Sequence, residues 1–248
     1  MEAIYYIPDY ITEEEEKKCV EAIYKDDTSS SYVGEKKGWV CLSKRRLKNL
    51  GGIPHPNGMY KESLPKYITD FRKLLHQKGH SIDKFIEIPS DQVKNHDYNQ
   101  VLLNEYECGK GIRPHKDGPL YSDIALVLSL KTTSLIDFYT EKPTEENEES
   151  VLASVFLEPR SLLIFCKEAY TDYFHGVRDV DQDVINPEKC INMQTANVSA
   201  GQIIPRNTTR LSLTIRNVKT VITEKNYTSS ESQEIERRRS WWQSAIDN

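Results

Sequence analysis

The 248-residue chain is predicted to be an α+β protein that is mainly β, a jelly roll (double-stranded β-helix) with supporting N-terminal helices. Six short runs of β-branched, leucine-rich or aromatic residues follow residue 95, with turn residues between them. Because no crossover helix separates these runs, they favour an antiparallel jelly roll or sandwich over a parallel α/β sheet. The predicted strands are Gln100–Tyr106, Ile124–Leu130, Ser134–Tyr139, Val151–Leu157, Arg160–Phe165 and Arg210–Asn217.

The N-terminal residues 1–95 are predicted to contain two helices. Thr12 and Glu15 have the spacing of a capping box, which predicts a helix that runs to about Lys25. Apolar residues at steps of three and four predict a second helix over Leu64–Lys78. Between the helices, Ser43–Gly58 is rich in glycine, proline and cations, so we expect a long basic loop.

The core is predicted to span residues 96–219, within one structural domain overall. Five glutamates in residues 141–150 predict a solvated loop, and the polar segment 179–207 has no periodicity and is expected to be an insertion. The tail, residues 220–248, is predicted to be either a docked helix or a flexible arm.

Composition restricts the partners and the location of the protein. The net charge of -5 means that the chain as a whole does not attract nucleic acid, so any such contact would be local. No apolar run approaches the roughly 18 residues of a membrane span. Five scattered cysteines without a recognisable leader predict free thiols in the cytoplasm or nucleus, and we expect a monomer.

The run Arg210-Leu211-Ser212-Leu213-Thr214-Ile215-Arg216 gives the predicted last strand two different faces, because successive side chains of a strand point to opposite sides. One face is purely apolar. The other carries two hydroxyls between two guanidinium groups. By itself this alternation also fits an ordinary strand with one face in water.

A candidate metal site elsewhere in the chain favours the interpretation that the polar face of this strand binds an anion rather than facing water. His115 and Asp117 project to the same side of an extended backbone, and His175 follows a later strand. Two histidines and one carboxylate are the ligand set of non-haem ferrous iron, although zinc also takes these ligands. Iron with open positions can bind a 2-oxo acid, and Arg210 could pair with the far carboxylate of a dicarboxylic one.

These motifs resemble the AlkB family of Fe(II)- and 2-oxoglutarate-dependent dioxygenases. The matching positions occur in the family's order: Asn104 and Tyr106, then His115-Lys116-Asp117, then His175, then the strand from Arg210 to Arg216. The resemblance extends over nearly the whole chain except the tail. It implies a jelly roll that oxidises a substrate C–H bond with dioxygen, so that an N-methyl group is released as formaldehyde.

The resemblance also implies roles for individual residues. His115, Asp117 and His175 would bind Fe(II), Arg210 would pair with the distal carboxylate of 2-oxoglutarate, and Tyr106 would add its hydroxyl there. Further cofactor contacts are implied for Asn104 and Arg216, near the metal-bound end, and for Ser212, which stands where the founding bacterial member has asparagine. The longer spacing between His175 and Arg210 implies that the insertion is a loop near the mouth of the active site.

The basic segment before the core is compatible with more than one class of substrate. In the family a lid before the core grips the substrate, and the cations Lys44, Arg45, Arg46 and Lys48 lie in that region. They could contact the phosphates of DNA or RNA, engage an acidic protein or simply be solvated. Alternatives to nucleic-acid demethylation are a protein hydroxylase or demethylase and a non-catalytic ligand-binding module. Stacking partners for a base would come from Trp39, Tyr60 and Tyr121.

Overall fold

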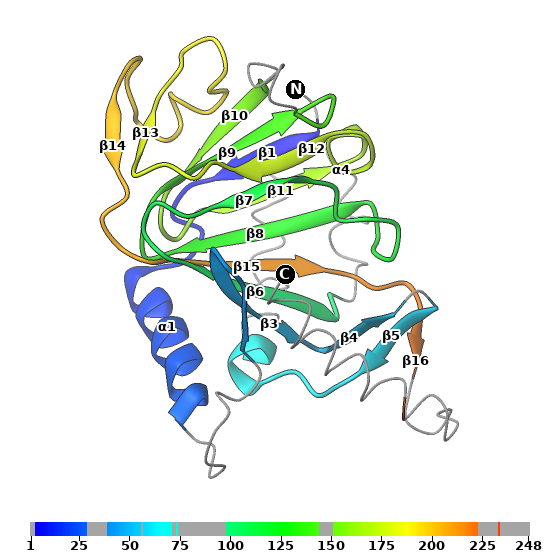
Figure 1. Cartoon of the computed structure of the whole chain (residues 1–248). Coiled ribbons are helices and arrows are strands. Elements are labelled where there is room, and N and C mark those ends of the chain that lie inside the picture. Colours follow the sequence, from blue (N-terminus) through cyan, green and yellow to red (C-terminus); the bar gives the residue numbers. More distant parts are fainter. Residues whose placement is uncertain are drawn as a thin grey trace.

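Two antiparallel sheets face each other in the computed structural model, which describes residues 3–28, 39–55, 57–70, 73, 98–143, 151–222 and 233 (Figure 1). The predicted class, mainly β with a jelly roll, is confirmed. The larger sheet has the order β1 (Ile4–Ile7), β11 (Leu162–Cys166), β8 (Ile124–Leu130), β15 (Arg210–Arg216), β6 (Gln100–Tyr106), β3 (Arg45–Leu50), β2 (Val40–Cys41). The smaller sheet has the order β10 (Val151–Leu157), β9 (Ser134–Tyr139), β12 (Phe174–Val177), β7 (Ile112–His115).

The predicted strands of the core are present, with one shifted start. The strand predicted from Arg160 begins instead at Leu162. Arg160 has a positive φ of 69°, and its amide donates to the carbonyl of Ser129, so this residue forms a turn rather than part of the ladder. Strand β15 ends at Arg216, one residue before the predicted end.

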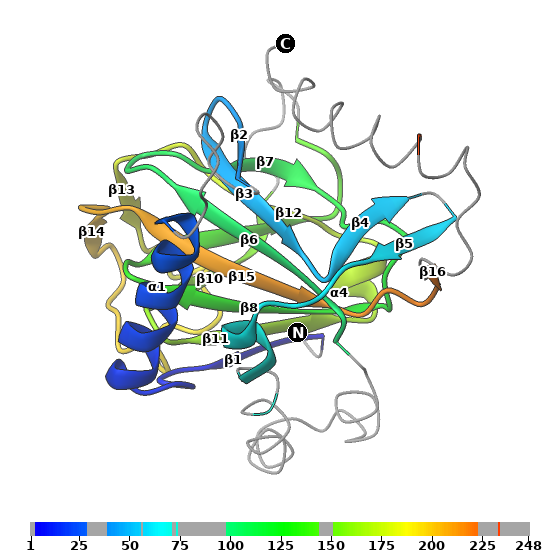
Figure 2. The same ribbon diagram turned by 90° about the horizontal axis from the view of Figure 1, so that it is seen from below.

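Helix α1 (Glu13–Thr28) lies across the outer face of the larger sheet (Figure 2). The predicted capping box is formed: the Thr12 amide donates to Glu15 Oε2 at 2.7 Å, and the Glu15 amide donates to Thr12 Oγ1 at 3.2 Å. Ile23 of α1 packs into the cluster that contains Leu211 and Leu213 of β15. Of the second predicted helix, residues 66–70 and 73 are helical, and the rest lies outside the described residues.

The segment Ser43–Gly58, predicted to be a loop, is largely β structure, so that prediction is wrong. Strand β3 pairs along its whole length with β6, β4 (Gly52–His55) pairs with β5 (Gly58–Lys61), and β16 (Val221–Ile222) lies parallel to β5. The tight turn between β3 and β4 requires glycine at position 51, because a Cβ on Gly51 would lie 2.1 Å from the carbonyl oxygen of Asn99. The pairing with β6 outweighs the local loop signals.

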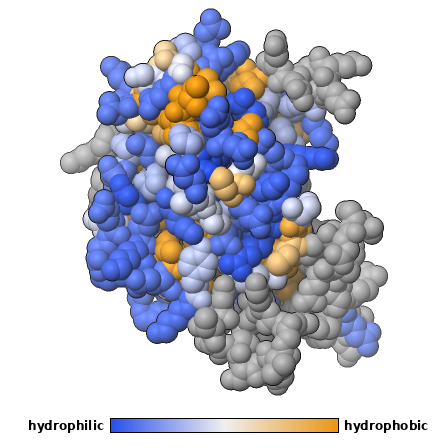
Figure 3. Space-filling model, turned by 60° about the vertical axis from the view of Figure 1, so that its left-hand side comes forward, coloured by the Kyte–Doolittle hydropathy of each residue, from blue (hydrophilic) through white to orange (hydrophobic). Residues whose placement is uncertain are grey.

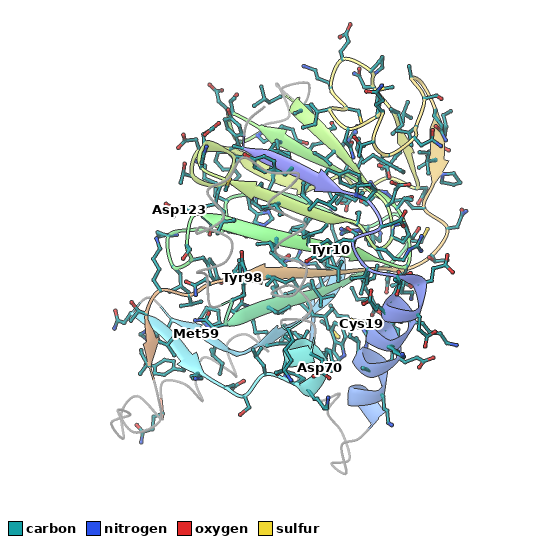
Figure 4. All side chains as sticks on the ribbon, turned by 180° about the vertical axis from the view of Figure 1, so that it is seen from behind. Tyr10, Cys19, Met59, Asp70, Tyr98 and Asp123 are labelled. Carbon is teal, nitrogen blue, oxygen red and sulfur yellow. The ribbon has the colours of Figure 1, made fainter. Side chains whose placement is uncertain are left out.

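Apolar residues form separate layers on the two sides of the larger sheet. The outer layer includes Leu126, Leu128, Leu211 and Leu213, with Ile23 of α1. The layer between the sheets includes Val127, Phe138, Leu163 and Phe165, and the rings of Phe138 and Phe165 meet edge to face at 5.7 Å. Tyr98 and Tyr10 belong to the outer layer and lie on the side seen in Figure 4. Three strands of the predicted N-terminal region, β1, β2 and β3, are members of this same sheet.

The insertion 179–207 is folded rather than an irregular loop. Its strands β13 (Gln182–Val184) and β14 (Ile203–Pro205) pair with each other. Ile185 and Cys190 pack against Leu135 and Phe156, on a cluster separate from the layer between the sheets. Most of the insertion therefore covers the outer face of the smaller sheet, and its Asp183 and Arg206 side chains are close enough to Arg210 to influence the pKa of that residue. Apolar side chains reach the surface where β13 and β14 lie (Figure 3).

We expect Asp183→Asn to lower the free energy of unfolding by about 3–5 kcal/mol, because it leaves a buried arginine without its counter-ion. The Arg206 guanidinium donates to the two carboxylate oxygens of Asp183 from Nε at 2.8 Å and Nη2 at 2.6 Å. Both side chains are buried. Urea unfolding measures the change, and Glu14→Gln, which breaks the exposed pair with Lys18, is the control. Equal small effects of the two substitutions would show that the buried pair is not structural.

Two predictions concern residues that are largely undescribed. Of the acidic loop 141–150, residues 144–150 lie outside the described residues, as does the tail after Ile222 except for residue 233. Among the helices of the described part, none has the length and apolar character needed to cross a membrane. The five cysteines are free thiols, as predicted.

Candidate active site

The polar face of β15 points into the space between the sheets. Arg210, Ser212 and Arg216 are buried there, whereas the leucines of the same strand pack outward against α1. Three polar residues of β15 lie opposite polar residues of β6: Arg210 pairs with Tyr106, Ser212 with Asn104, and Arg216 with Gln100. The predicted cofactor contacts thus come together on one inner surface.

The predicted metal ligands also meet. His115 on β7 lies directly opposite His175 on β12, and their ring centroids are 4.5 Å apart. Asp117 follows two residues after His115, and its Oδ1 is 3.8 Å from His115 Nε2. One ligand atom from each of the three side chains lies within 4.8 Å of the others. This is close enough for a single metal ion.

Neighbouring groups orient these ligands. His115 Nδ1 lies 2.9 Å from the carbonyl oxygen of Arg113, which can only accept, so the ring proton is on Nδ1 and the Nε2 lone pair is free for a metal. Arg216 Nη1 holds Asp117 Oδ1 at 3.1 Å. Asp117 Oδ2 and His175 Nδ1 are buried and have no hydrogen-bond partner among the described residues. Buried polar atoms in that state fit a bound ion.

The charges of the site favour the metal-binding protonation states. Burial opposes ionisation of Asp117, but Arg216 and the two histidines outweigh it and keep the pKa of the carboxyl below its usual range. Burial, with contributions from His115 and Arg216, lowers the pKa of His175 to about 4. At neutral pH the site therefore presents a carboxylate and an unprotonated His175.

Arg210 is a buried cation with unused donor capacity. Its Nη2 donates to Ser129 Oγ at 2.9 Å, its guanidinium carbon lies 5.6 Å from the centroid of the Tyr106 ring, and its Nε has no partner among the described residues. Burial lowers the pKa of Arg210 to about 10, so it remains charged at neutral pH. No carboxylate pairs with it in the described part of the chain, as expected for an anion-binding arginine. Sequence reasoning missed Ser129, because a serine in an apolar strand carries no distinctive pattern.

The four predicted substrate cations do not form one basic surface. Because they lie on or next to a strand, they alternate between faces. Arg46 and Lys48 lie within 5.0 Å of the Trp39 ring, Lys48 is buried, and Arg46 pairs with Glu105. Arg46 and Lys48 thus lie together on the outer face, and a role of the four cations in substrate binding stays a prediction.

The two other cations have their own partners. Lys44 pairs with Asp179 at the start of the insertion. Arg45 shares the inner face with Tyr106, which lies opposite it on β6. The three aromatic residues considered for base stacking, Trp39, Tyr60 and Tyr121, are all buried.

The structure has an open depression of about 590 Å³ whose lining includes residues that closely follow Asp117 in the chain. It is formed by the tip of the β4–β5 hairpin, by Pro119 and Leu120, which follow Asp117 in the chain, and by Lys219 and Thr220 after β15. Sequence reasoning missed this feature, because these residues come from three separate segments that only the fold brings together.

A jelly roll that carries two histidines and one carboxylate on its inner strands, with a buried arginine further along, has the site of a 2-oxo-acid-dependent iron oxygenase. The chain belongs to the 2OG-Fe(II) oxygenase superfamily, whose model matches residues 3–216, and within it to the AlkB family. The protein is thus an oxidoreductase that uses Fe(II), 2-oxoglutarate and O2.

Two curated relatives and one solved structure illustrate the similarity. The chain is 36% identical over 225 residues to the zebrafish (Danio rerio) probable RNA/DNA demethylase ALKBH6, covering 88% of this chain and 87% of the relative. It is 26% identical to the Xenopus tropicalis tRNA (carboxymethyluridine(34)-5-O)-methyltransferase alkbh8, covering 86% of this chain and 31% of that protein. The structure of OsALKBH1 has the same fold, with a TM-score of 0.55, 18% identity and coverage of 88% of this chain and 97% of that one.

Proposed function

We propose that the protein oxidatively removes alkyl groups from nucleic acid, with His115, Asp117 and His175 as the iron ligands and Arg210 as the partner of the distal carboxylate of 2-oxoglutarate. The observation that carries the proposal is the set of buried, unsatisfied atoms on Asp117, His175 and Arg210, which belong to the two facing sheets and the turn after β7. A metal ion and a dicarboxylate would satisfy all three.

Each residue then has a defined task. Iron with 2-oxoglutarate and O2 supplies the oxidising power for a C–H bond. Arg216 occupies one oxygen of Asp117 and leaves the other for the metal. The Arg113 carbonyl fixes the tautomer of His115. Arg210 and Ser129 hold the far end of the co-substrate, and the apolar layer around Phe138 and Phe165 shields that space from water.

Nucleic acid is favoured as the substrate by the relatives and by the shape of the site. The zebrafish relative is named as a probable RNA/DNA demethylase. The depression at the β4–β5 hairpin is lined in part by Pro119, which follows Asp117 closely in the chain, and by Lys219, whose positive charge suits a phosphate near a base presented to the metal. Lys219 also pairs with Asp123, an exposed residue, so this ion pair can be exchanged for a phosphate.

A release assay on methylated pools tests the substrate. The purified protein, with Fe(II) and 2-oxoglutarate, is offered N-methylated RNA, N-methylated DNA and methylated peptides, and both succinate and formaldehyde are measured. We expect succinate and formaldehyde in equal amounts with a nucleic-acid pool. Stimulation by the peptide pool alone would overturn the nucleic-acid assignment and leave the oxygenase chemistry intact.

A further inference from the structure

We propose that Arg45 is a positioning residue for 2-oxoglutarate, which acts by orienting the side-chain amide of Asn104 so that its N–H groups face the co-substrate. The proposal rests on the proposed function, since it assumes that 2-oxoglutarate lies along β15. It gives one of the four cations on and beside β3 a role that differs from phosphate binding.

The geometry places Arg45 at the co-substrate end of the cavity. It lies opposite Tyr106 on β6, and Tyr106 in turn lies opposite Arg210 on β15, so that two guanidinium groups flank one phenol across three strands. Burial raises the pKa of Tyr106, and the positive charges of Arg210 and Arg45 partly offset this rise. Arg45 is half-buried, close to the edge of the larger sheet.

The contact that carries the inference is the hydrogen bond from Arg45 Nε to Asn104 Oδ1, at 3.1 Å. A side-chain amide has one acceptor oxygen and one donor nitrogen, and it can be turned either way. When the oxygen is turned toward Arg45 to accept this bond, the N–H groups point away from Arg45 and are available to other partners. A carboxylate or a 2-oxo group is an acceptor, so this orientation attracts 2-oxoglutarate and the flipped one repels it.

Asn104 is in place to use this orientation. It is buried and lies opposite Ser212 on β15, one step along the strands from the Tyr106–Arg210 pair. A ligand whose far carboxylate is held by Arg210 passes this position on its way to the metal. Arg45 would therefore preorganise a donor that otherwise has two orientations.

The neighbouring arginine supplies a matched control. Arg46 has the same charge and lies on the same strand, but it faces the opposite side, where it contacts Trp39 and Glu105. A general effect of positive charge or of strand stability would appear in both positions. An effect through Asn104 would appear only at Arg45.

The test measures 2-oxoglutarate affinity by calorimetry with Mn²⁺, which is redox-inert here, in the wild type, Arg45→Gln, Arg46→Gln, Asn104→Ala and the double variant Arg45→Gln/Asn104→Ala. We expect Arg45→Gln to weaken binding about tenfold and Arg46→Gln to leave it within about twofold. In the Asn104→Ala background, Arg45→Gln should have no further effect, because both changes remove the same donor. Independent, additive losses would overturn the proposal.

Turnover provides the second readout. Arg45→Gln should raise the KM for 2-oxoglutarate by the same factor, with little change in kcat or in the KM for nucleic acid. An increase in the KM for nucleic acid alone would show instead that Arg45 contacts the substrate. Asn104→Asp retains the bond to Arg45 but presents an anionic oxygen, so it should weaken 2-oxoglutarate binding more than Arg45→Gln does. Unchanged affinity in this variant would also contradict the proposal. If the wild type itself bound no 2-oxoglutarate, the proposed function would fail, which is a different result.

Discussion

Asp117→Ala is expected to lower iron-dependent succinate formation by more than about 100-fold, because it removes one of three metal ligands and the partner of Arg216. The carboxylate is the only anionic group of the three. Without it, two imidazoles remain beside the positive Arg216 with no anionic ligand, and the site binds a divalent cation poorly. Fe(II) binding, followed by equilibrium dialysis, should decrease together with turnover.

Asp123→Ala is the matched control for this loss. Asp123 lies on the turn before β8, is exposed and forms an ion pair with Lys219 (Figure 4). Its removal should leave iron binding nearly unchanged. It should also leave succinate formation in the absence of nucleic acid nearly unchanged. Since Asp117→Ala leaves Arg216 buried without its carboxylate, thermal unfolding of the metal-free proteins must accompany the comparison. Near-normal turnover in folded Asp117→Ala would contradict the ligand assignment.

Arg210→Ala is expected to raise the KM for 2-oxoglutarate by about 30-fold or more, because truncating one member of a buried charge pair costs about 2–5 kcal/mol. Arg210 is the buried cation whose Nε has no partner in the described part of the chain, so the co-substrate carboxylate is its expected counter-ion. At saturating 2-oxoglutarate the variant should regain most of its kcat. Initial rates over a wide range of 2-oxoglutarate measure both quantities.

Arg46→Ala is the control, because Arg46 is also an arginine of the larger sheet but its side chain lies on the outer face. This variant should leave the KM for 2-oxoglutarate nearly unchanged. Arg210→Lys should fall between wild type and alanine, because an ammonium restores the charge but not the bidentate geometry. An unchanged dependence on 2-oxoglutarate in Arg210→Ala would refute the assignment of this residue.

The metal and co-substrate residues could be predicted from sequence because strand alternation alone determines which side chains share a face. The run from Arg210 to Arg216 has the same inner and outer faces in the structure as in the prediction. His-x-Asp likewise projects to one side wherever the backbone is extended. The meeting of His175 with His115 depends on the order of strands in the smaller sheet, which strand alternation does not determine.

The basic segment shows why the substrate surface was not predictable. Glycines and prolines in Ser43–Gly58 indicate turns, but the pairing partner of β3 is β6, more than fifty residues away in the chain. Once β3 is a strand, Lys48 is directed to the outer face and Arg45 to the inner one. Local composition contains no information about such a distant partner.

The insertion is a second case. Its polar composition predicts an irregular loop, yet a few apolar side chains, including Ile185 and Cys190, attach it to the smaller sheet. Its buried pair of Asp183 and Arg206 is formed by residues 23 positions apart. Neither contact has a periodic signal, so the insertion could be recognised from sequence only as an extra segment.

Anaerobic addition of Fe(II) and 2-oxoglutarate to the folded protein tests the metal and co-substrate site without the need for a substrate. We expect a visible charge-transfer band from the chelated oxo acid in the wild type, no band in Asp117→Ala, and a band that needs more 2-oxoglutarate in Arg210→Ala. The absence of the band in folded wild-type protein at saturating iron and 2-oxoglutarate would contradict the assignment of this site.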